Sequence, residues 1–385
     1  MFAALSLLAV GLLALSPSAY LPPVMQTAPA AVDTIETLTI PSFDAYPLEG
    51  RLYLPPDQPP SALVIYVNGS GPNTNQNTRQ LSADMTFSYF DLVASGFNEV
   101  GAAFFSYSTR GVTASDTPPF YHTIDPQAYQ TYLPKYSVQD VAAIVRALRT
   151  DSRLHDCPIY LLGWSEGTMI APKVAQLVPV DGLLLAGYVN GTMQQVLDWQ
   201  QTGGSSMVTY CLYFDADGDG RVSQAEYEND RYGVRPALGL DQVVFSELDA
   251  DGDGQLTASD FAALLTPSRQ ALYDAITRSD DAWLAENYPV RLTSAWFHAH
   301  AYFTPNRDML TELDLPIVIF QGQADANVPV QDTLDIQAQF AALGKDNLTV
   351  HLYPNVDHDL NFASYLSTGI WPQAWCDLFA AVAPK

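Results

Sequence analysis

A serine stands between two glycines in the segment GWSEG, residues 163–167, directly after the apolar run Ile159–Leu162. A buried strand, a tight turn and a helix in this order form a nucleophile elbow, which holds a serine hydroxyl out at the carboxyl end of the strand. The turn is so tight that the positions two residues before and two residues after the serine tolerate almost no side chain, which accounts for Gly163 and Gly167. The sequence therefore predicts Ser165 as a nucleophile.

A serine nucleophile needs a base, and the base needs a carboxylate that orients it. In proteins with such an elbow, the order of the three residues along the chain is serine, acid and histidine, and the acid and the histidine lie in loops after later strands. Asp325 follows the apolar run Ile317–Phe320, and His358 follows the strand-like segment Leu348–Tyr353. We predict these two as acid and base. The alternatives are a loop or helix-capping aspartate and a surface histidine.

The other histidines fit the role of base less well. They are His122, His155, His298, His300 and His351. Two precede the elbow, one lies inside a predicted strand, and two fall in a polar helical block where packing is the favoured role. Asp357 adjoins His358 and would point away from it, so it is a poor orienting group.

Backbone N–H groups near the nucleophile could stabilise a negative charge on a reacting oxygen. The N–H of Glu166 lies at the start of the predicted helix, which favours an anion there. Ser70 lies in the segment NGSG, residues 68–71, just after the apolar strand Ala62–Val67. We predict both N–H groups as oxyanion donors. A plain turn after a strand would use the same residues around Ser70.

Strands that alternate with helices must position these groups. A hairpin is predicted over Thr34–Ile40 and Leu48–Leu54, and a helix over residues 82–95. The later predicted elements are strands at Ala62–Val67, Glu99–Phe105, Ile159–Leu162, Leu183–Val189, Ile317–Phe320 and Leu348–Tyr353, and helices at Tyr136–Thr150, from Glu166, near 331–343 and near 371–383. This alternation predicts an α/β fold with a mostly parallel sheet and helices on both faces. Residues 190–312 lack buried-strand patterns and are predicted as a helical cap insertion.

Two twelve-residue loops in the insertion match the calcium-binding loop of the EF-hand. The predicted ligands of the first loop are Asp215, Asp217, Asp219, Arg221 through its carbonyl, Ser223 and Glu226. Those of the second are Asp249, Asp251, Asp253, Gln255, Thr257 and Asp260. Val222 and Leu256 are expected to pair in a short two-stranded bridge. Asp260 is one methylene shorter than glutamate, so the second site should bind Ca²⁺ more weakly.

Calcium in the insertion has two possible roles. Both loops could bind Ca²⁺ simply to fold the insertion, because clustered carboxylates repel one another until a cation arrives. Alternatively, Ca²⁺ could order a lid over Ser165. Extracellular Ca²⁺ at roughly 10⁻³ M would saturate even weak sites, which favours the structural role.

Length and charge limit the function classes. The chain has 385 residues, is 48% hydrophobic and carries a formal net charge of −25. The charge argues against nucleic acid and anionic membranes as partners. It indicates a solvated surface or cation binding. Three cysteines cannot form a disulfide framework.

The N-terminal run Phe2–Leu15 is apolar and is followed by small residues. It is short for a membrane span and fits a signal peptide, although it lacks a basic start. We expect residues 1–33 to be signal peptide and linker, the protein to be secreted or periplasmic, and no stable membrane anchor.

Together, the hairpin, the NGSG segment, the STRGV segment at 108–112, the GWSEG elbow, Asp325 and His358 resemble the α/β-hydrolase superfamily. The elbow is similar to that of bacterial serine esterases with G-x-S-E-G, here with an inserted EF-hand pair. The resemblance covers roughly 34–190 and 313–383 and implies a carboxylic ester hydrolase with an acyl-enzyme intermediate. The chain departs from the family pattern at Asn68, Ser108 and Thr168.

The predicted domains are thus a hydrolase core over 34–189 and 313–385 and a cap over 190–312. The predicted substrate is a small-molecule ester. The rivals are a serine peptidase of the same fold that acts on small peptides and a calcium-dependent interaction module on a hydrolase scaffold. Five cap aromatics could line an acyl pocket or pack the cap: Trp199, Tyr210, Trp296, Phe297 and Tyr302.

Overall fold

The structure is a computed structural model that describes residues 34–56, 58–82 and 85–384. The predicted signal peptide and linker, residues 1–33, lie outside the described residues. Among the described helices, none combines the length and the apolar character that a membrane crossing requires.

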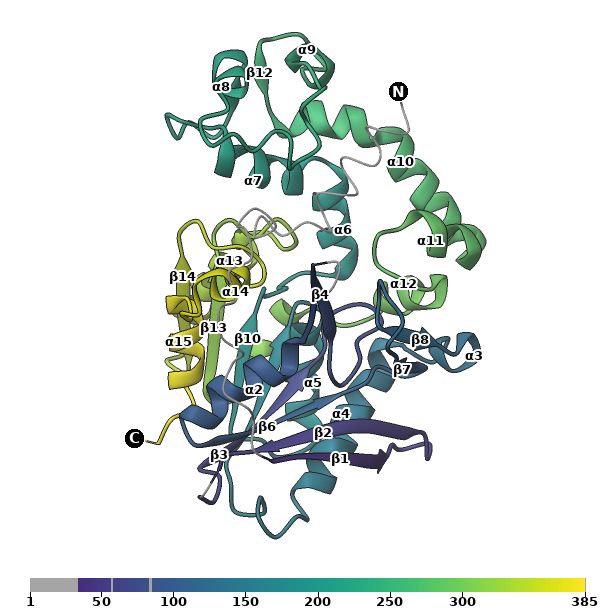
Figure 1. Ribbon diagram of the computed structural model, residues 1–385, viewed down its shortest axis with the longest axis vertical. Helices are drawn as coiled ribbons and strands as arrows, with labels where there is room; N and C mark the ends of the chain where they lie inside the picture. Colours follow the sequence, from purple (N-terminus) through teal and green to yellow (C-terminus); the bar gives the residue numbers. More distant parts are fainter. Residues whose placement is uncertain (1–33, 57, 83–84, 385) are drawn as a thin grey trace.

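An eight-stranded sheet forms the centre of the molecule (Figure 1). We call this sheet and the helices that cover its two faces the sheet domain. Its strands, in spatial order, are β1 (Thr34–Pro41), β2 (Pro47–Leu54), β6 (Ala102–Tyr107), β3 (Ala62–Val67), β9 (Ile159–Trp164), β10 (Gly182–Ala186), β13 (Ile317–Gly322) and β14 (Leu348–Tyr353). The pairs from β6 to β14 are parallel, and β2 runs antiparallel to both of its neighbours. The predicted hairpin at the sheet edge is confirmed.

Helices cover both faces of this sheet. Alternate residues of β3 point to opposite sides, because successive side chains of a strand face opposite ways. On one side Ile65 joins an apolar core with α4 (Pro134–Leu148), α5 (Gly167–Leu177) and α13 (Val330–Ala342). On the other side Val64 joins a core with α2 (Tyr89–Glu99), α14 (Phe362–Thr368) and α15 (Gln373–Ala380). The predicted α/β fold class, a mostly parallel sheet with helices on both faces, is confirmed.

Most of the residues between β10 and β13 are helical, and we call this segment, residues 187–316, the helical block. The elements are α6 (Met193–Gln201), α7 (Gly204–Tyr213), β11 (Val222–Ser223), α8 (Gln224–Asn229), α9 (Phe245–Leu248), β12 (Gln255–Leu256), α10 (Ala258–Arg278), α11 (Asp281–Asn287), α12 (Ser294–His300), η2 (Asn306–Asp308) and η3 (Leu310–Glu312). We call residues 204–265 the EF-hand lobe, because an apolar core of its own unites them. In Figure 1 the lobe stands at the top, away from the sheet. The predicted domain boundaries at 190 and 312 stay predictions.

The segment before β6 differs from its prediction. Instead of a helix over 82–95, β4 (Thr78–Ser82) and β5 (Met85–Ser88) pair as a hairpin, and α2 begins only at Tyr89. The side chain of Ser88 accepts a hydrogen bond from the N–H of Asp91 and so caps α2. A serine cap stops a helix from extending backwards. The structure also contains four elements that were not predicted from the sequence: β7 (Val112–Ala114), β8 (His122–Ile124), α3 (Pro126–Tyr129) and α14.

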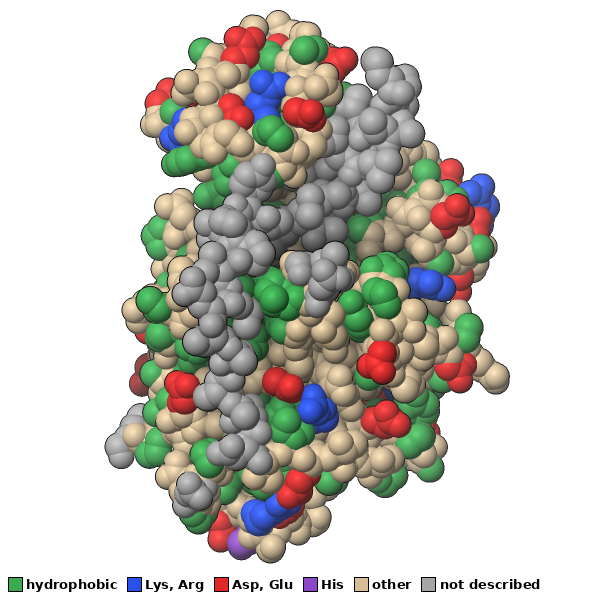
Figure 2. All heavy atoms as spheres, viewed as in Figure 1, with side chains coloured by type: hydrophobic (Ala, Val, Ile, Leu, Met, Phe, Trp, Pro, Cys, Tyr) green, Lys and Arg blue, Asp and Glu red, His purple; other side chains and the backbone are tan. Residues whose placement is uncertain are grey.

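Charge is spread over the surface on the face seen in Figure 2. Acidic side chains (red) outnumber basic ones (blue) and lie scattered over both the EF-hand lobe and the sheet domain. They form no single patch on this face. Cys157, Cys211 and Cys376 are free thiols.

Candidate active site

The turn after β9 has the geometry of a nucleophile elbow. Ser165 has φ +55°, a left-handed conformation that is strained for a residue with a side chain. A Cβ at Gly163 would lie 2.5 Å from the carbonyl oxygen of Gly167, and one at Gly167 would lie 2.1 Å from that of Val67. Both glycines are therefore required by close backbone packing. The N–H of Ser165 donates to the Ala186 carbonyl of β10 (2.9 Å), which fixes the turn against the sheet.

Asp325 and His358 form a hydrogen-bonded pair. The distance between His358 Nδ1 and Asp325 Oδ2 is 2.8 Å, and the Asp325 side chain is fully buried. Asp325 Oδ2 also accepts from Gln321 Nε2 (3.0 Å), while Oδ1 accepts the N–H groups of Asn327 (2.8 Å) and Val328 (2.9 Å). These bonds hold the carboxylate in one orientation, so that it orients the imidazole in turn.

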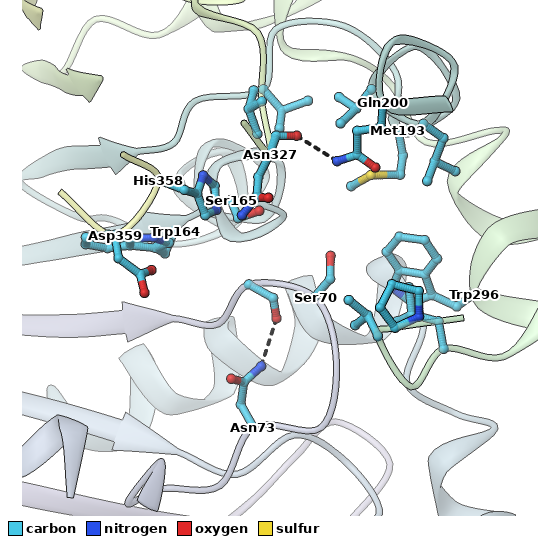
Figure 3. Close-up of a pocket in the computed structure, with 18 of the residues that line it drawn as sticks. Ser70, Asn73, Trp164, Ser165, Met193, Gln200, Trp296, Asn327, His358 and Asp359 are labelled. Carbon is cyan, nitrogen blue, oxygen red and sulfur yellow. Dashed lines mark hydrogen bonds between the residues drawn. The ribbon is translucent and has the colours of Figure 1, made fainter. Parts of the chain in front are cut away.

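The His358 ring lies next to the elbow. A Cβ at Gly187 would lie 2.5 Å from Cε1 of the ring, and Gly187 directly follows the residue that binds the Ser165 N–H. Ser165 and His358 line the same cavity (Figure 3). The Ser165 hydroxyl donates no hydrogen bond to a described residue in this conformation. Its hydrogen bond to His358 stays a prediction, and such contacts often tighten only when substrate binds.

The charge state of His358 is set by two opposing effects. Burial of the ring lowers its pKa, but the Asp325 charge and its hydrogen bond outweigh burial and raise the pKa to about 9, with smaller contributions from Asp359 and Asp357. A carboxylate in contact favours the imidazolium. The pair is therefore suited to hold a proton taken from a nucleophile. The Asp357 carboxylate instead accepts the N–H groups of Asp359 and Asn361.

Two unpaired N–H groups lie at the predicted oxyanion positions. Within the described chain, the backbone N–H groups of Ser70 and Glu166 make no hydrogen bond. A Cβ at Gly69 would lie 3.3 Å from the Ser165 Cβ, so the loop before Ser70 passes close to the nucleophile. Asn73 Nδ2 donates to the Gly69 carbonyl (2.9 Å) and holds this loop (Figure 3).

The cavity beside Ser165 has a volume of about 240 Å³. Its apolar wall comes mainly from the helical block: Val189, Met193, Val196, Leu197, Tyr288, Val290, Leu292 and Trp296, with Val328. Polar residues in the lining include Asn73, Asn77, Arg79 and Asp359. Gln200 of α6 donates to the Asn327 carbonyl (2.7 Å), which ties the helical block to the loop of Asp325.

The five cap aromatics have different surroundings. Trp296 lines the cavity. Tyr210 packs in the core of the EF-hand lobe, Phe297 packs in the core between the block and the sheet domain, and Tyr302 is 92% exposed. Trp199 packs against Gly204. The acyl-pocket interpretation is therefore supported for Trp296 alone.

The other described histidines lie away from the cavity lining. His122 and His155 contact nearby backbone carbonyls, and His351 stacks on a phenylalanine within the sheet. His298 is exposed. His300 is buried and contacts Glu166, whose side chain has no predicted role.

The first EF-hand loop brings its carboxylates together. Ligand oxygens of Asp215, Asp217 and Glu226 lie within 4.8 Å of one another. Gly220 has φ +81° at the sharp turn of the loop. Hydrogen bonds from the N–H groups of Ser223 and then Ala216 lower the pKa of Glu226 to about 2, so it is a carboxylate at neutral pH. Asp219 lies in the same loop but outside this cluster, and its Oδ1 accepts the Arg221 N–H.

The second loop has a different cluster. Oxygens of Asp249, Asp251 and Asp253 lie within 4.8 Å of one another, and the buried Asp260 is not among them. Asp260 accepts from the N–H groups of Ala250 (2.9 Å) and Thr257 (2.8 Å).

Between the two loops, β11 pairs with β12 through Val222 and Leu256, and the predicted bridge is confirmed. The Gln255 and Thr257 ligand roles, like those of Arg221 and Ser223, stay predictions. The oxygen-rich loops nevertheless have the donor set that Ca²⁺ prefers.

Comparisons with known proteins agree with two parts of this description. The family model described as EF hand matches residues 213–229 and 240–265. Esterase EstD of Thermotoga maritima is 25% identical over 153 residues, which cover 40% of this chain and 33% of that protein. The match thus spans about a third of the length of that relative.

Solved structures with a similar fold include an esterase from Pyrobaculum calidifontis, with 16% identity, 98% of this chain and 90% of that chain covered, and a TM-score of 0.48. An esterase from Exiguobacterium antarcticum has 14% identity, 91% and 100% coverage, and a TM-score of 0.45.

Proposed function

We propose that this chain is a serine hydrolase of carboxylic esters, with Ser165 as nucleophile, His358 as base and Asp325 as orienting acid. One observation carries the proposal: the 2.8 Å His358–Asp325 pair and the strained Ser165 lie at the same cavity. Separate loops from β9, β13 and β14 supply the three residues. The order along the chain is that of a nucleophile elbow with its acid and histidine.

In the acylation step, Ser165 Oγ attacks the ester carbonyl carbon while His358 Nε2 takes the hydroxyl proton. The carbonyl π electrons move to the oxygen, and the N–H groups of Ser70 and Glu166 stabilise that charge. When the intermediate collapses, the bond to the alcohol oxygen breaks and His358 returns the proton to it. The products are the free alcohol and an acyl-Ser165 ester.

Deacylation repeats these steps with water as nucleophile. His358 takes a proton from water while the water oxygen bonds to the acyl carbon. His358 then gives this proton to Ser165 Oγ as the bond between Oγ and the acyl carbon breaks. Asp325 stabilises the imidazolium, because its carboxylate accepts the hydrogen bond from His358 Nδ1–H in both steps.

The cavity favours an ester with a small apolar acyl group. Its volume of about 240 Å³ is below the roughly 300–1,000 Å³ of pockets that hold drug-sized ligands. The apolar wall from α6 and Trp296 would receive the acyl chain. The polar lining residues, among them Arg79 and Asn73, would face the alcohol.

We further propose that the EF-hand loops hold Ca²⁺ and that the ion folds the lobe. Asp215, Asp217 and Glu226 would supply oxygens in the first loop, and Asp249 and Asp251 in the second. The lobe has its own apolar core, which favours a local role for the ion. Export to a Ca²⁺-rich compartment, as the N-terminal run predicts, is part of this proposal.

The test is hydrolysis of p-nitrophenyl esters with acyl chains of two to twelve carbons. We expect turnover that is highest for the shortest chains, and a loss of roughly 10⁴–10⁶ in kcat for Ser165→Ala. Ser152→Ala, at an exposed serine, is the control. Equal activity in Ser165→Ala and parent would refute the assignment. Faster cleavage of aminoacyl anilides than of esters would favour the peptidase, and no turnover of either would favour an interaction module.

A further inference from the structure

The carboxylate of Glu166 has hydrogen-bond partners in two separate parts of the molecule. It is 1% exposed, although it immediately follows the nucleophile. Its Oε2 accepts from the Tyr132 hydroxyl at 2.5 Å. Its Oε1 lies 3.1 Å from Trp296 Nε1 and 2.8 Å from His300 Nε2, both on α12. A buried carboxylate is stable only when such donors replace water.

Tyr132 extends this network to the loop of the other oxyanion donor. The N–H of Gly71 donates to the Tyr132 oxygen (3.2 Å), so the hydroxyl proton of Tyr132 is free to bond Glu166. Gly71 directly follows Ser70, and its φ of +103° sets the direction of the chain there. The phenol of Tyr132 therefore connects the loop of Ser70 with the turn of Glu166.

The network contains both oxyanion positions. The backbone N–H of Glu166 is one predicted donor, and the side chain of the same residue is held by Tyr132, Trp296 and His300. The second donor, the N–H of Ser70, belongs to the loop that Tyr132 holds. Neither donor makes a hydrogen bond within the described chain, so no bond of their own fixes their direction.

We propose that Glu166 and Tyr132 are positioning residues that hold both oxyanion donors at the distance a tetrahedral intermediate requires, and that α12 takes part through Trp296 and His300. This inference rests on the proposed function. Because oxyanion donors act mainly in the transition state, an error in their placement lowers kcat more than it changes KM. A simple packing role for the same residues would lower stability without this asymmetry.

Tyr132→Phe tests the proposal, and Tyr129→Phe is its matched control. The Tyr129 ring lies 5.4 Å from that of Tyr132, but its hydroxyl donates to the Arg291 carbonyl and not to Glu166. For Tyr132→Phe we expect kcat on p-nitrophenyl acetate to fall about 10- to 100-fold with KM within about threefold, less than for a deleted donor. Tyr129→Phe should change kcat less than about threefold.

Inhibition by butylboronic acid supplies a second readout. Ser165 Oγ adds to its boron while His358 takes the hydroxyl proton, which gives an anionic tetrahedral adduct, so this probe senses the oxyanion donors directly. In Tyr132→Phe its Ki should rise by about the factor lost in kcat/KM, whereas in Tyr129→Phe it should not change. Equal Ki values in both variants would overturn the inference.

Thermal unfolding separates these effects from loss of the fold. If Tyr132→Phe does not fold, Glu166→Gln is the second variant, because it keeps the size of the side chain and one acceptor oxygen. The same rise in Ki is expected, and an unchanged Ki in a folded Glu166→Gln refutes the idea. A parent protein with no esterase activity and no boronate inhibition would instead refute the proposed function itself.

Discussion

The ionisation of His358 is governed by its acidic neighbours. In the proposed mechanism only the neutral ring can accept a proton from Ser165, so kcat/KM should rise with pH and level off above the His358 pKa in the free enzyme. That pKa is raised from 6.5 to about 9. We therefore predict an acid limb whose midpoint lies above 6.5 in a pH profile of kcat/KM.

Asp325→Asn should move this midpoint downward and also lower kcat, because the amide cannot stabilise the imidazolium. Asp359→Asn is the comparison, since Asp359 acts on the ring through its charge and should cause a smaller shift with less loss of rate. If the midpoint stayed the same in both variants, the acidic neighbours would not be the cause of the raised His358 pKa.

The same pair links pH to stability. A histidine whose pKa is raised on folding contributes stability that is complete below its unfolded pKa and is lost as pH rises through the folded value. We predict that the parent loses stability relative to Asp325→Asn between about pH 6.5 and 9, measured by urea unfolding at a series of pH values. No pH dependence of this difference would count against a raised pKa.

At the residue scale, chain order and local motif were enough to place Ser165, Asp325 and His358 in loops that meet. The role of the Glu166 side chain could not be predicted. Its partner Tyr132 lies 34 residues earlier in the chain, and no motif links the two. The other partners of the Glu166 side chain belong to α12. The position of α12 next to the elbow results from tertiary packing, which the local spacing of residues does not predict.

The two EF-hand loops differ most at their last predicted ligand. Asp260 is shorter than Glu226 and lies outside the acidic cluster of its loop. A longer carboxylate can bind Ca²⁺ through both oxygens, so Asp260→Glu should tighten the second site by on the order of tenfold. Isothermal titration with Ca²⁺ measures both sites.

The reverse substitution, Glu226→Asp, is the matched control and should weaken the first site by a similar factor. If Asp260→Glu left both affinities unchanged, the last position of the second loop would not be a ligand.

At the element scale, the strands and α4 were predictable because burial imposes a strict period on the residues that contact the sheet. Val138, Val141 and Ile144 are all buried, at helical spacing. The β4–β5 hairpin was not predictable in this way. Its residues are mostly polar, so their spacing carries no burial pattern, and the Ser88 cap alone decides where α2 starts.

The molecule combines a sheet domain with a lobe that has a separate core. The buried apolar residues of the EF-hand lobe form one cluster, which is separate from the clusters on the two faces of the sheet. If the lobe holds Ca²⁺ as proposed, removal of the ion should leave the lobe carboxylates to repel one another and so weaken that lobe alone. Saturating Ca²⁺ at 100 times Kd stabilises the bound unit by about 2.7 kcal/mol.

We therefore predict that EGTA lowers by several degrees the temperature at which the amides of residues 204–265 lose protection from hydrogen exchange, whereas the corresponding transition of the strand amides in the sheet moves little. Added Mg²⁺ controls for ionic strength. Equal shifts of both transitions would mean that the lobe and the sheet domain unfold together, and no shift of either would contradict calcium binding.

Strand order also matters while the protein is being made. β10 ends at Ala186 and its neighbour β13 begins at Ile317, so the ribosome must synthesise the whole helical block before the two strands can pair. At 5–20 residues per second this takes on the order of ten seconds. Throughout that time the nascent chain presents an open apolar strand edge, which is a template for aggregation. Translation speed through residues 187–316 thus determines how long chaperones must shield the growing sheet.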